Sequence, residues 1–321
     1  MGGCGPWSEC AVRGREPVVS DPGNIPVPGP AAGITRQEGQ CSSADGLDLH
    51  WRSWLPTSAI GTIVVIHGLA EHGGRYQETA EYYAAHGWAV YAGDLRGHGL
   101  SADAPGAGRV HVGRFTDYFM DVDAFRNLAL ERNAHSPLFL LGHSMGGLIT
   151  ISYVLQSSEP VSGAIISSPA LGTHPDFKPP AVLRLLVTVL DRLAPRIRFP
   201  SDLDTSAVSR DPAVVQAYLD DPLVSQKVSA RWYAEILRAI RRAHADAHAL
   251  SVPLLLMQSG ADRLVDPAAP TRWADAAPPG LVELVTWQGF YHEMFNEPER
   301  HQVRLRTLEW LLQQMAQLTA D

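Results

Sequence analysis

One stretch constrains the fold more than any other, residues 137–147, which read Pro-Leu-Phe-Leu-Leu-Gly-His-Ser-Met-Gly-Gly. Its apolar first half predicts a buried strand, and the residues from Gly146 to about Gln156 predict a helix. Between them, the pattern G-x-S-x-G places Ser144 on a turn so sharp that its backbone is strained. Glycine is needed at 142 and 146 because a Cβ atom there would collide with the neighbouring strand and helix. The stretch therefore predicts a strand-turn-helix unit that holds one serine hydroxyl clear of a sheet.

Short apolar runs rich in β-branched residues recur on both sides of this unit. The run over residues 61–66, GTIVVI, is typical of a parallel strand that is buried on both faces. Strands are predicted over residues 61–66, 88–92, 138–141, 163–167, 254–258 and 281–287, and helices over 76–85, 116–132, 146–156, 267–276 and 298–317. A hairpin over residues 37–55 precedes them. The alternation predicts an α/β fold with a mostly parallel central sheet and helices on both faces.

The alternation stops near residue 169. From there to about residue 243 we predict no strand, because the sequence consists of proline pairs and helical segments, over 181–193, 212–218 and 229–242. We interpret this part as a helical cap inserted into the sheet domain. The chain is thereby divided into a disordered Pro/Gly-rich tail (1–36), the first part of the core (37–170), the cap (171–243) and the second part of the core (244–321).

The composition excludes several classes of protein. The net charge is −8 and no run of Lys or Arg occurs, which argues against nucleic acid as a partner. Three cysteines without a C-x-x-C pair argue against a disulfide framework and favour a reducing compartment. No segment is apolar enough to span a bilayer, and the first residues lack the layout of a signal peptide. We therefore expect a cytoplasmic protein, associated with a membrane at most peripherally; its oligomeric state stays open.

A serine on such a turn becomes a nucleophile only when a base takes its proton. The pattern predicts an acid and then a histidine later in the chain, each in a loop that follows a strand. Asp262 and His292 occupy those two places. We predict that His292 is the general base for Ser144 and that Asp262 orients its imidazole and stabilises the charged form. Asp266 is the rival acid, although it lies further from the strand end.

Attack of a serine on a carbonyl carbon creates a negative oxygen, which backbone N–H groups can stabilise. One donor is expected from Met145, directly after the serine and at the start of the helix. The other is most simply Leu69, in the loop that follows the strand over 61–66. The turn at His67-Gly68, which opens this loop, is therefore interpreted as part of the site.

Two other groups of polar residues are given structural roles. His244 and His248 stand four positions apart, as metal ligands can, but no H-E-x-x-H pattern accompanies them. We therefore expect a solvent-exposed helix face there, and neither a metal nor a cofactor. Asp94, Arg96 and His98 follow a predicted strand and are interpreted as a brace for the loop beneath the site.

The predicted cap helix over residues 181–193 carries a wide apolar surface. Its few polar residues, Arg184, Thr188, Asp191 and Arg192, fall on one stripe. Two interpretations stay open. The helix is a lid that touches acyl chains or a lipid surface, or it packs on the core of the protein.

Four separated motifs and the cap resemble the monoacylglycerol lipases. The motifs are HGLAEHGGRY from His67, DLRGHGLS from Asp94, GHSMGG from Gly142 and YHEMFNE from Tyr291, and the cap matches in LDTSAVSRDP from Leu203 and YLDDPL from Tyr218. The resemblance is closest to the bacterial and mycobacterial-type enzymes and runs from about residue 38 to the end.

This resemblance implies an α/β-hydrolase fold with a helical cap, and a serine hydrolase that cleaves monoacylglycerols to fatty acid and glycerol without a cofactor. It also implies that Glu71, Arg75, His143 and Tyr218 bind the glycerol end of the substrate. Related enzymes include lysophospholipases and broad-specificity carboxylesterases, which remain the alternative. An aminopeptidase on the same fold and a binding protein without activity are more distant hypotheses.

Overall fold

The computed structural model describes residues 33–103, 108–133, 136–176, 181–201 and 203–319. Most of the predicted tail lies outside these ranges. The strands are β1 (Thr35–Ser42), β2 (Asp48–Leu55), β3 (Gly61–Ile66), β4 (Trp88–Gly93), β5 (Leu138–His143), β6 (Gly163–Ser167), β7 (Arg198–Pro200), β8 (Lys227–Ser229), β9 (Leu254–Ser259) and β10 (Val282–Trp287). The α-helices are α1 (Gln77–Ala85), α2 (Asp117–Arg132), α3 (Met145–Gln156), α4 (Ala181–Leu193), α5 (Pro212–Asp220), α6 (Ala230–Ala245), α7 (Ala269–Ala276) and α8 (Arg300–Leu318). Short 3₁₀ turns are η1 (Gly73–Tyr76), η2 (Gly99–Asp103), η3 (Thr205–Ala207), η4 (Ala247–Ala249) and η5 (Met294–Asn296).

The central sheet has the strand order β1-β2-β4-β3-β5-β6-β9-β10. The strands from β4 to β10 along this order are mutually parallel, whereas the hairpin β1-β2 joins at one edge in antiparallel pairing. In β3, β4, β5 and β9 every residue is buried, because helices cover both faces. The predicted α/β-hydrolase fold with its mostly parallel sheet is confirmed.

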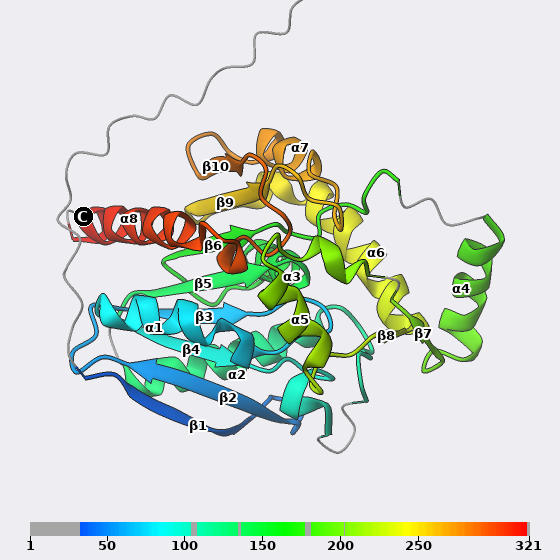
Figure 1. The fold of residues 1–321 in the computed structure, drawn as a ribbon, viewed down its shortest axis with the longest axis horizontal. Coiled ribbons are helices and arrows are strands. Elements are labelled where there is room, and N and C mark those ends of the chain that lie inside the picture. Colours follow the sequence, from blue (N-terminus) through cyan, green and yellow to red (C-terminus); the bar gives the residue numbers. More distant parts are fainter. Residues whose placement is uncertain (1–32, 104–107, 134–135, 177–180, 202, 320–321) are drawn as a thin grey trace, which may run out of the picture.

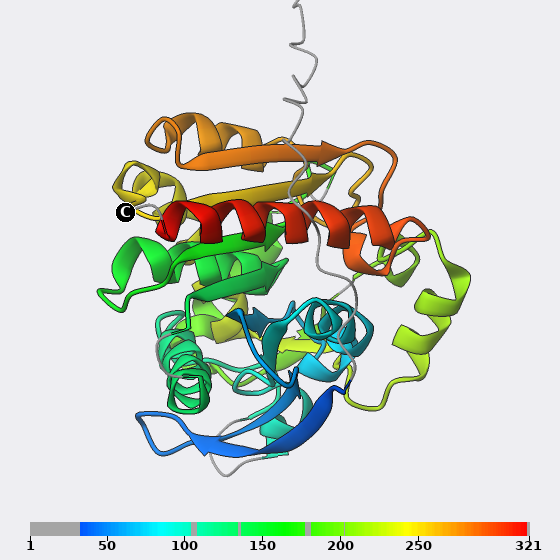
Figure 2. The same cartoon turned by 90° about the vertical axis from the view of Figure 1, so that its left-hand side faces the viewer.

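Two apolar cores lie on the two faces of the sheet (Figures 1 and 2). On one face α1 and α8 pack, through residues such as Tyr83 and Leu308. On the other face lie α2, α3, α6 and α7, through residues such as Phe125, Ile149 and Trp273. Figure 2 shows α8, in red, running alongside the strands on the first face. Because the strands are parallel, their carboxyl ends meet at one edge, and the loops that carry function gather there.

The chain between β6 and β9 forms α4, β7, η3, α5, β8, α6 and η4. Most of these elements lie beyond the carboxyl ends of the central strands (Figure 1). Helix α6 leads from there back to α3, and α4 contacts α6. The predicted helix over 181–193 has the bounds of α4. The prediction that residues 169–243 hold no strand is wrong, since β7 and β8 pair, with Arg198 opposite Ser229. Each has only three residues, too few for a recognisable pattern.

The predicted end of the tail at residue 36 is also wrong by two residues. Thr35 and Arg36 belong to β1 and pair with Leu55 and Trp54 of β2. The predicted hairpin is present, and its turn contains Asp45-Gly46, where Gly46 has a φ of +80°. A glycine suits that position because it adopts positive φ without strain.

Candidate active site

Ser144 lies between the last residue of β5 and the first residue of α3. Its φ of 53° and ψ of −116° fall in a region that residues with a side chain rarely occupy. The two flanking glycines permit this geometry. A Cβ atom on Gly142 would lie 2.4 Å from Thr150 Oγ1, and one on Gly146 would lie 2.0 Å from the carbonyl oxygen of Ile66. The strained turn thus brings the hydroxyl to the carboxyl edge of the sheet.

The loops after β9 and β10 bring an acid and a histidine to this serine. His292 Nε2 lies 2.8 Å from Ser144 Oγ, and His292 Nδ1 lies 2.8 Å from Asp262 Oδ2. An ionised carboxylate only accepts, so Nδ1 carries the proton and Nε2 accepts from the serine hydroxyl. Asp262 is itself held by the backbone N–H groups of Leu264 and Val265, at 2.9 and 3.0 Å. The geometry is that of a nucleophile, a base and an orienting acid.

The ionisation of Asp262 and that of His292 depend on each other. Burial alone would lower the pKa of His292, but the Asp262 carboxylate raises it above the ordinary value. Burial would raise the pKa of Asp262, whereas the charge and hydrogen bond of His292 and two backbone N–H groups lower it. Asp262 is therefore ionised at neutral pH, and the imidazole is made more basic. Such a histidine is suited to take a proton from serine and later return it.

The rival acid, Asp266, is engaged elsewhere. One of its oxygens accepts from the backbone N–H of Ala268 at 2.9 Å, and the other binds the guanidinium of Arg272 at 2.6 Å. The carboxylate of Asp266 thus stabilises the turn before α7, whereas that of Asp262 is hydrogen-bonded to His292.

Two backbone N–H groups suit the predicted oxyanion site. Met145 is the first residue of α3, and the first N–H groups of a helix have no partner within it. Leu69 follows β3, and both residues line the cavity above Ser144. The neighbouring Gly68 N–H is already bound to Glu71 Oε1 at 2.6 Å. This arrangement supports the choice of Leu69 and Met145 as the donors, which stays a proposal.

A cavity of about 630 Å³ lies above Ser144 and His292. Most of its wall is apolar and comes from the segment between β6 and β9, including Val187, Leu190, Phe199, Trp232, Ile236 and Ile240. In the 181–193 helix, Val187 of α4 is buried and lines the cavity, while Leu193 is 80% exposed.

Polar side chains gather at the part of the cavity formed by the loop after β3, the loop after β10 and α5. Three of the four predicted substrate-binding residues, Glu71, His143 and Tyr218, line the cavity there. Among the described residues that form the wall, Arg75 does not appear. Its guanidinium lies behind, bonded to Glu71 Oε2 at 2.7 Å and to both oxygens of Glu293 at 2.7 and 2.8 Å.

The ionisation of these groups follows from their contacts. Burial would raise the pKa of Glu71, but the Arg75 guanidinium lowers it to about 2. Burial and the neighbouring His292 lower the pKa of His143 to about 4, so its imidazole is neutral at neutral pH. Two carboxylates, Glu71 and Glu293, therefore share one guanidinium, and this end of the cavity has an excess of negative charge.

Sequence reasoning missed Glu293 as a site residue, although it directly follows His292. Its signal was present, because a second acidic residue beside a predicted base can contact the substrate. The cap residues of the cavity wall were also missed as individuals. Apolar residues on a helix show which face is buried, but not against what they pack.

Asp94 and His244, for which the sequence predicts structural roles, are both hydrogen-bonded to other parts of the protein. Asp94 is fully buried and accepts from the backbone N–H groups of Gly73 and Leu100 and from Arg52, all at 2.8 to 2.9 Å. His244 is hydrogen-bonded to the carbonyl oxygen of Leu171 at 2.8 Å, and His248 lies outside α6. The part of the chain that the structure describes holds no group of three potential metal ligands. None of the helices described there has the length and apolarity needed to cross a membrane.

Comparison with known proteins finds similar hydrolases. The Hydrolase_4 family model, described as serine aminopeptidase, S33, matches residues 57–299. The chain is 39% identical to phospholipase YtpA of Bacillus subtilis over 78% of this chain and 95% of that protein. It is 36% identical to monoacylglycerol lipase of Mycolicibacterium smegmatis, over 87% and 98% of the two chains. The crystal structure of Paleococcus ferrophilus monoacylglycerol lipase is similar, with a TM-score of 0.72 and 29% identity over 88% and 99%.

Proposed function

The chain belongs to the Hydrolase_4 family, and from this membership we propose that it hydrolyses monoacylglycerols to fatty acid and glycerol through an acyl-Ser144 intermediate. The observation that carries the proposal is the shape and polarity of the cavity. Apolar side chains of the segment between β6 and β9 and the polar side chains of Glu71, His143 and Tyr218 line one cavity, which also contains Ser144. A molecule with one acyl chain and a short uncharged head has the matching polarity, with its ester bond at Ser144.

In the first half of the reaction, Ser144 Oγ attacks the ester carbonyl carbon while its proton passes to His292 Nε2. The carbonyl oxygen becomes negative and accepts from the N–H groups of Leu69 and Met145. As this intermediate collapses, the bond to the glycerol oxygen breaks, and His292 gives its proton to that oxygen. Glycerol leaves, and the acyl group remains on Ser144.

In the second half, a water molecule attacks the acyl carbon, and its proton passes to His292 Nε2. The bond to Ser144 Oγ then breaks, the serine recovers its proton from His292, and the fatty acid leaves. Asp262 stays ionised throughout and stabilises the imidazolium that forms twice in each cycle. Glu71, His143 and Tyr218 provide acceptors and donors for the glycerol hydroxyls, and Arg75 holds Glu71 and Glu293 in place.

The excess of negative charge beside the site favours an uncharged head over a phosphate. We expect a 1-acylglycerol to have a kcat/KM at least about tenfold above that of the same acylglycerol with a 3-phosphate, because the phosphate would meet two carboxylates in a poorly solvated site. The measurement compares the two substrates with one acyl chain, short enough to remain monomeric. The Glu293→Gln variant is expected to lower the ratio of the two kcat/KM values, because it removes one of the two carboxylates.

The p-nitrophenyl ester of the same acid is the control, since it carries no headgroup charge. Equal rates for the neutral and phosphorylated substrates, or a preference for the phosphate, would favour a lysophospholipase, consistent with the likeness to phospholipase YtpA. Hydrolysis of amino-acid naphthylamides, with release of naphthylamine, would instead favour an aminopeptidase, in which the carboxylates would bind the substrate amine.

We also propose that α4 contacts a membrane or lipid surface. Apolar side chains are exposed on and after this helix, with Val189 at 42%, Leu193 at 80% and Ile197 at 49%. The exposed Arg192 and Arg196 lie among them. Apolar residues bordered by basic ones are typical of helices that lie in a membrane interface. A contact here would bring the cavity close to its substrate.

Replacement of Leu193 by serine is expected to weaken binding to phospholipid vesicles by about tenfold or more, since a buried leucine side chain is worth roughly 1.5–3 kcal/mol. Co-sedimentation with vesicles measures the effect, and hydrolysis of a soluble short-chain ester should stay unchanged. The control is Leu318→Ser, because Leu318 is another exposed leucine, at 47%, but lies on α8. Equal loss of binding in both variants would contradict a contact through α4.

A further inference from the structure

The loop that carries His292 is paired with a short segment of the chain between β6 and β9. We call this segment, residues 207–211, the strap; it connects η3 to α5. The backbone N–H of His292 donates to the carbonyl oxygen of Ala207 at 3.3 Å, and that of Glu293 donates to Val208 at 2.8 Å. The backbone of the proposed general base is therefore held by the strap and not only by its own strand.

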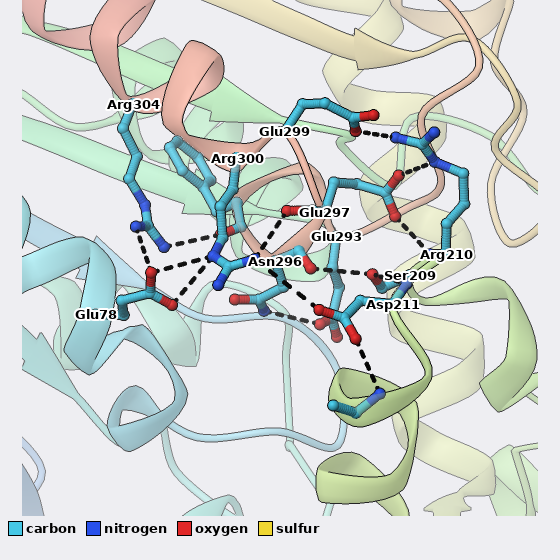
Figure 3. Close-up of polar contacts among 12 residues, drawn as sticks. Glu78, Ser209, Arg210, Asp211, Glu293, Asn296, Glu297, Glu299, Arg300 and Arg304 are labelled. Carbon is cyan, nitrogen blue, oxygen red and sulfur yellow. Dashed lines mark hydrogen bonds and ion pairs between the residues drawn. The ribbon is translucent and has the colours of Figure 1, made fainter.

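The pairing continues past these two residues, and both segments run in the same direction. Ser209 Oγ donates to the carbonyl oxygen of Asn296 at 3.0 Å. The backbone N–H of Arg210 donates to Glu297 Oε1 at 2.7 Å, and its Nε donates to Glu297 Oε2. Figure 3 shows Arg210 reaching Glu297 and Glu299 from the strap side. Each step along the strap thus meets a later residue of the His292 loop.

Glu297 is the buried end of this contact. Its side chain is fully buried, and each of its oxygens accepts from Arg210. A buried carboxylate is costly unless it is paired, so this pair fixes one register of strap and loop. The neighbouring Asn296 donates to Glu293 Oε2 at 2.9 Å. The hydrogen bonds of this loop therefore reach a residue of the cavity wall.

The loop is anchored to the core on its other side. Arg304 of α8 donates to the carbonyl oxygen of Phe295 at 3.2 Å and to Glu78 of α1 at 2.8 Å (Figure 3). Arg300 also binds Glu78, at 3.1 Å. The His292 loop is therefore clamped between a fixed helical side, α1 and α8, and the strap.

We propose that Glu297 is a positioning residue for His292. Through Arg210 it locks the strap against the loop, and the position of the cap thereby sets how His292 Nε2 lies relative to Ser144 Oγ. The inference rests on the proposed roles of Ser144 and His292. It assigns a function to an ion pair whose carboxylate is buried and which touches neither the substrate nor the reacting atoms.

The test is the Glu297→Gln variant, which keeps the shape of the side chain but replaces one accepting oxygen by a donor. We expect the rate of labelling by a fluorophosphonate probe, and kcat, to fall by roughly 10- to 100-fold, because small misplacements of a catalytic group have effects of that size. KM should change much less than kcat, since Glu297 itself contacts neither the polar end of the cavity nor its apolar wall.

The endpoint of labelling counts the folded sites, and the rate per labelled site reports their reactivity. A merely structural role would lower the endpoint and leave the rate per site at the wild-type value, which would overturn the proposal. The double variant Glu297→Met with Arg210→Met removes both charges; it should recover the endpoint of labelling but not the rate.

Glu299→Gln is the matched control. Glu299 binds the same guanidinium, but its carboxylate is 40% exposed, and surface pairs contribute little, so its labelling rate should stay within about twofold of wild type. Absence of labelling in the folded wild-type protein would instead refute the proposed role of Ser144. The two failures are thus distinguishable.

Discussion

Replacement of Ser144 by alanine is expected to lower kcat/KM for a monoacylglycerol by about 10⁴-fold or more. The acyl intermediate cannot form without Oγ, and His292, which lies 2.8 Å from that oxygen, then has no proton to take. The activity that remains would come from substrate binding and the two N–H donors. Steady-state hydrolysis, together with loss of fluorophosphonate labelling, measures the effect.

The fold of the Ser144→Ala variant should be unchanged, because alanine fits the space of serine and meets the same backbone strain at a φ of 53°. A matched control is Ser158→Ala, since Ser158 is exposed just beyond the other end of α3. If Ser144→Ala kept most of the wild-type rate, Ser144 would not be the nucleophile, and the mechanism would have to begin from another group.

Replacement of Asp262 by asparagine is expected to lower kcat by about 10⁴-fold, because an amide can present its NH₂ to Nδ1 and favour the wrong tautomer of His292. The acid limb of the pH profile should move as well. The base acts when neutral, and its pKa is raised above 6.5 in the wild type, so wild-type activity declines as the pH falls through that raised value. Without the carboxylate the pKa of His292 falls, and the limb moves to lower pH.

The control for this variant is Asp266→Asn, the rival acid in the same loop region. Its carboxylate serves Ala268 and Arg272, so the substitution should affect stability slightly and leave both kcat and the pH profile near wild type. Equal losses in the two variants, or an unshifted acid limb in Asp262→Asn, would contradict the assignment of Asp262.

The central sheet was largely predictable because its strands are short, apolar and bounded by turns. The predicted strand over 163–167 has the bounds of β6, and the predicted helix over 181–193 has those of α4. The order of Ser144, Asp262 and His292 was also predictable, since each follows a strand whose end lies at the same edge of the sheet. The structure then places these three side chains within hydrogen-bond distance.

What could not be predicted depends on contacts between distant segments. The resemblance gave Arg75 as a residue of the glycerol end, but its position behind Glu71 follows from the bond to Glu293, which comes from the other end of the chain. The pairing of Arg210 with Glu297 joins two loops without periodicity. Such pairs leave no pattern in one sequence, because either residue alone suits an exposed loop.

The neighbouring strands β6 and β9 have a consequence for how this architecture can vary. They are hydrogen-bonded in parallel, with Ile165 opposite Leu255, although the whole cap separates them in the chain. The entropy of closing a loop grows only with the logarithm of its length, so doubling such an insertion costs about 0.6 kcal/mol. The sheet therefore tolerates large changes of length at this junction, and new specificities can arise by replacing the insertion while the strands and the serine turn stay constant. A transplanted insertion would need to bring a segment that pairs with the loop of His292.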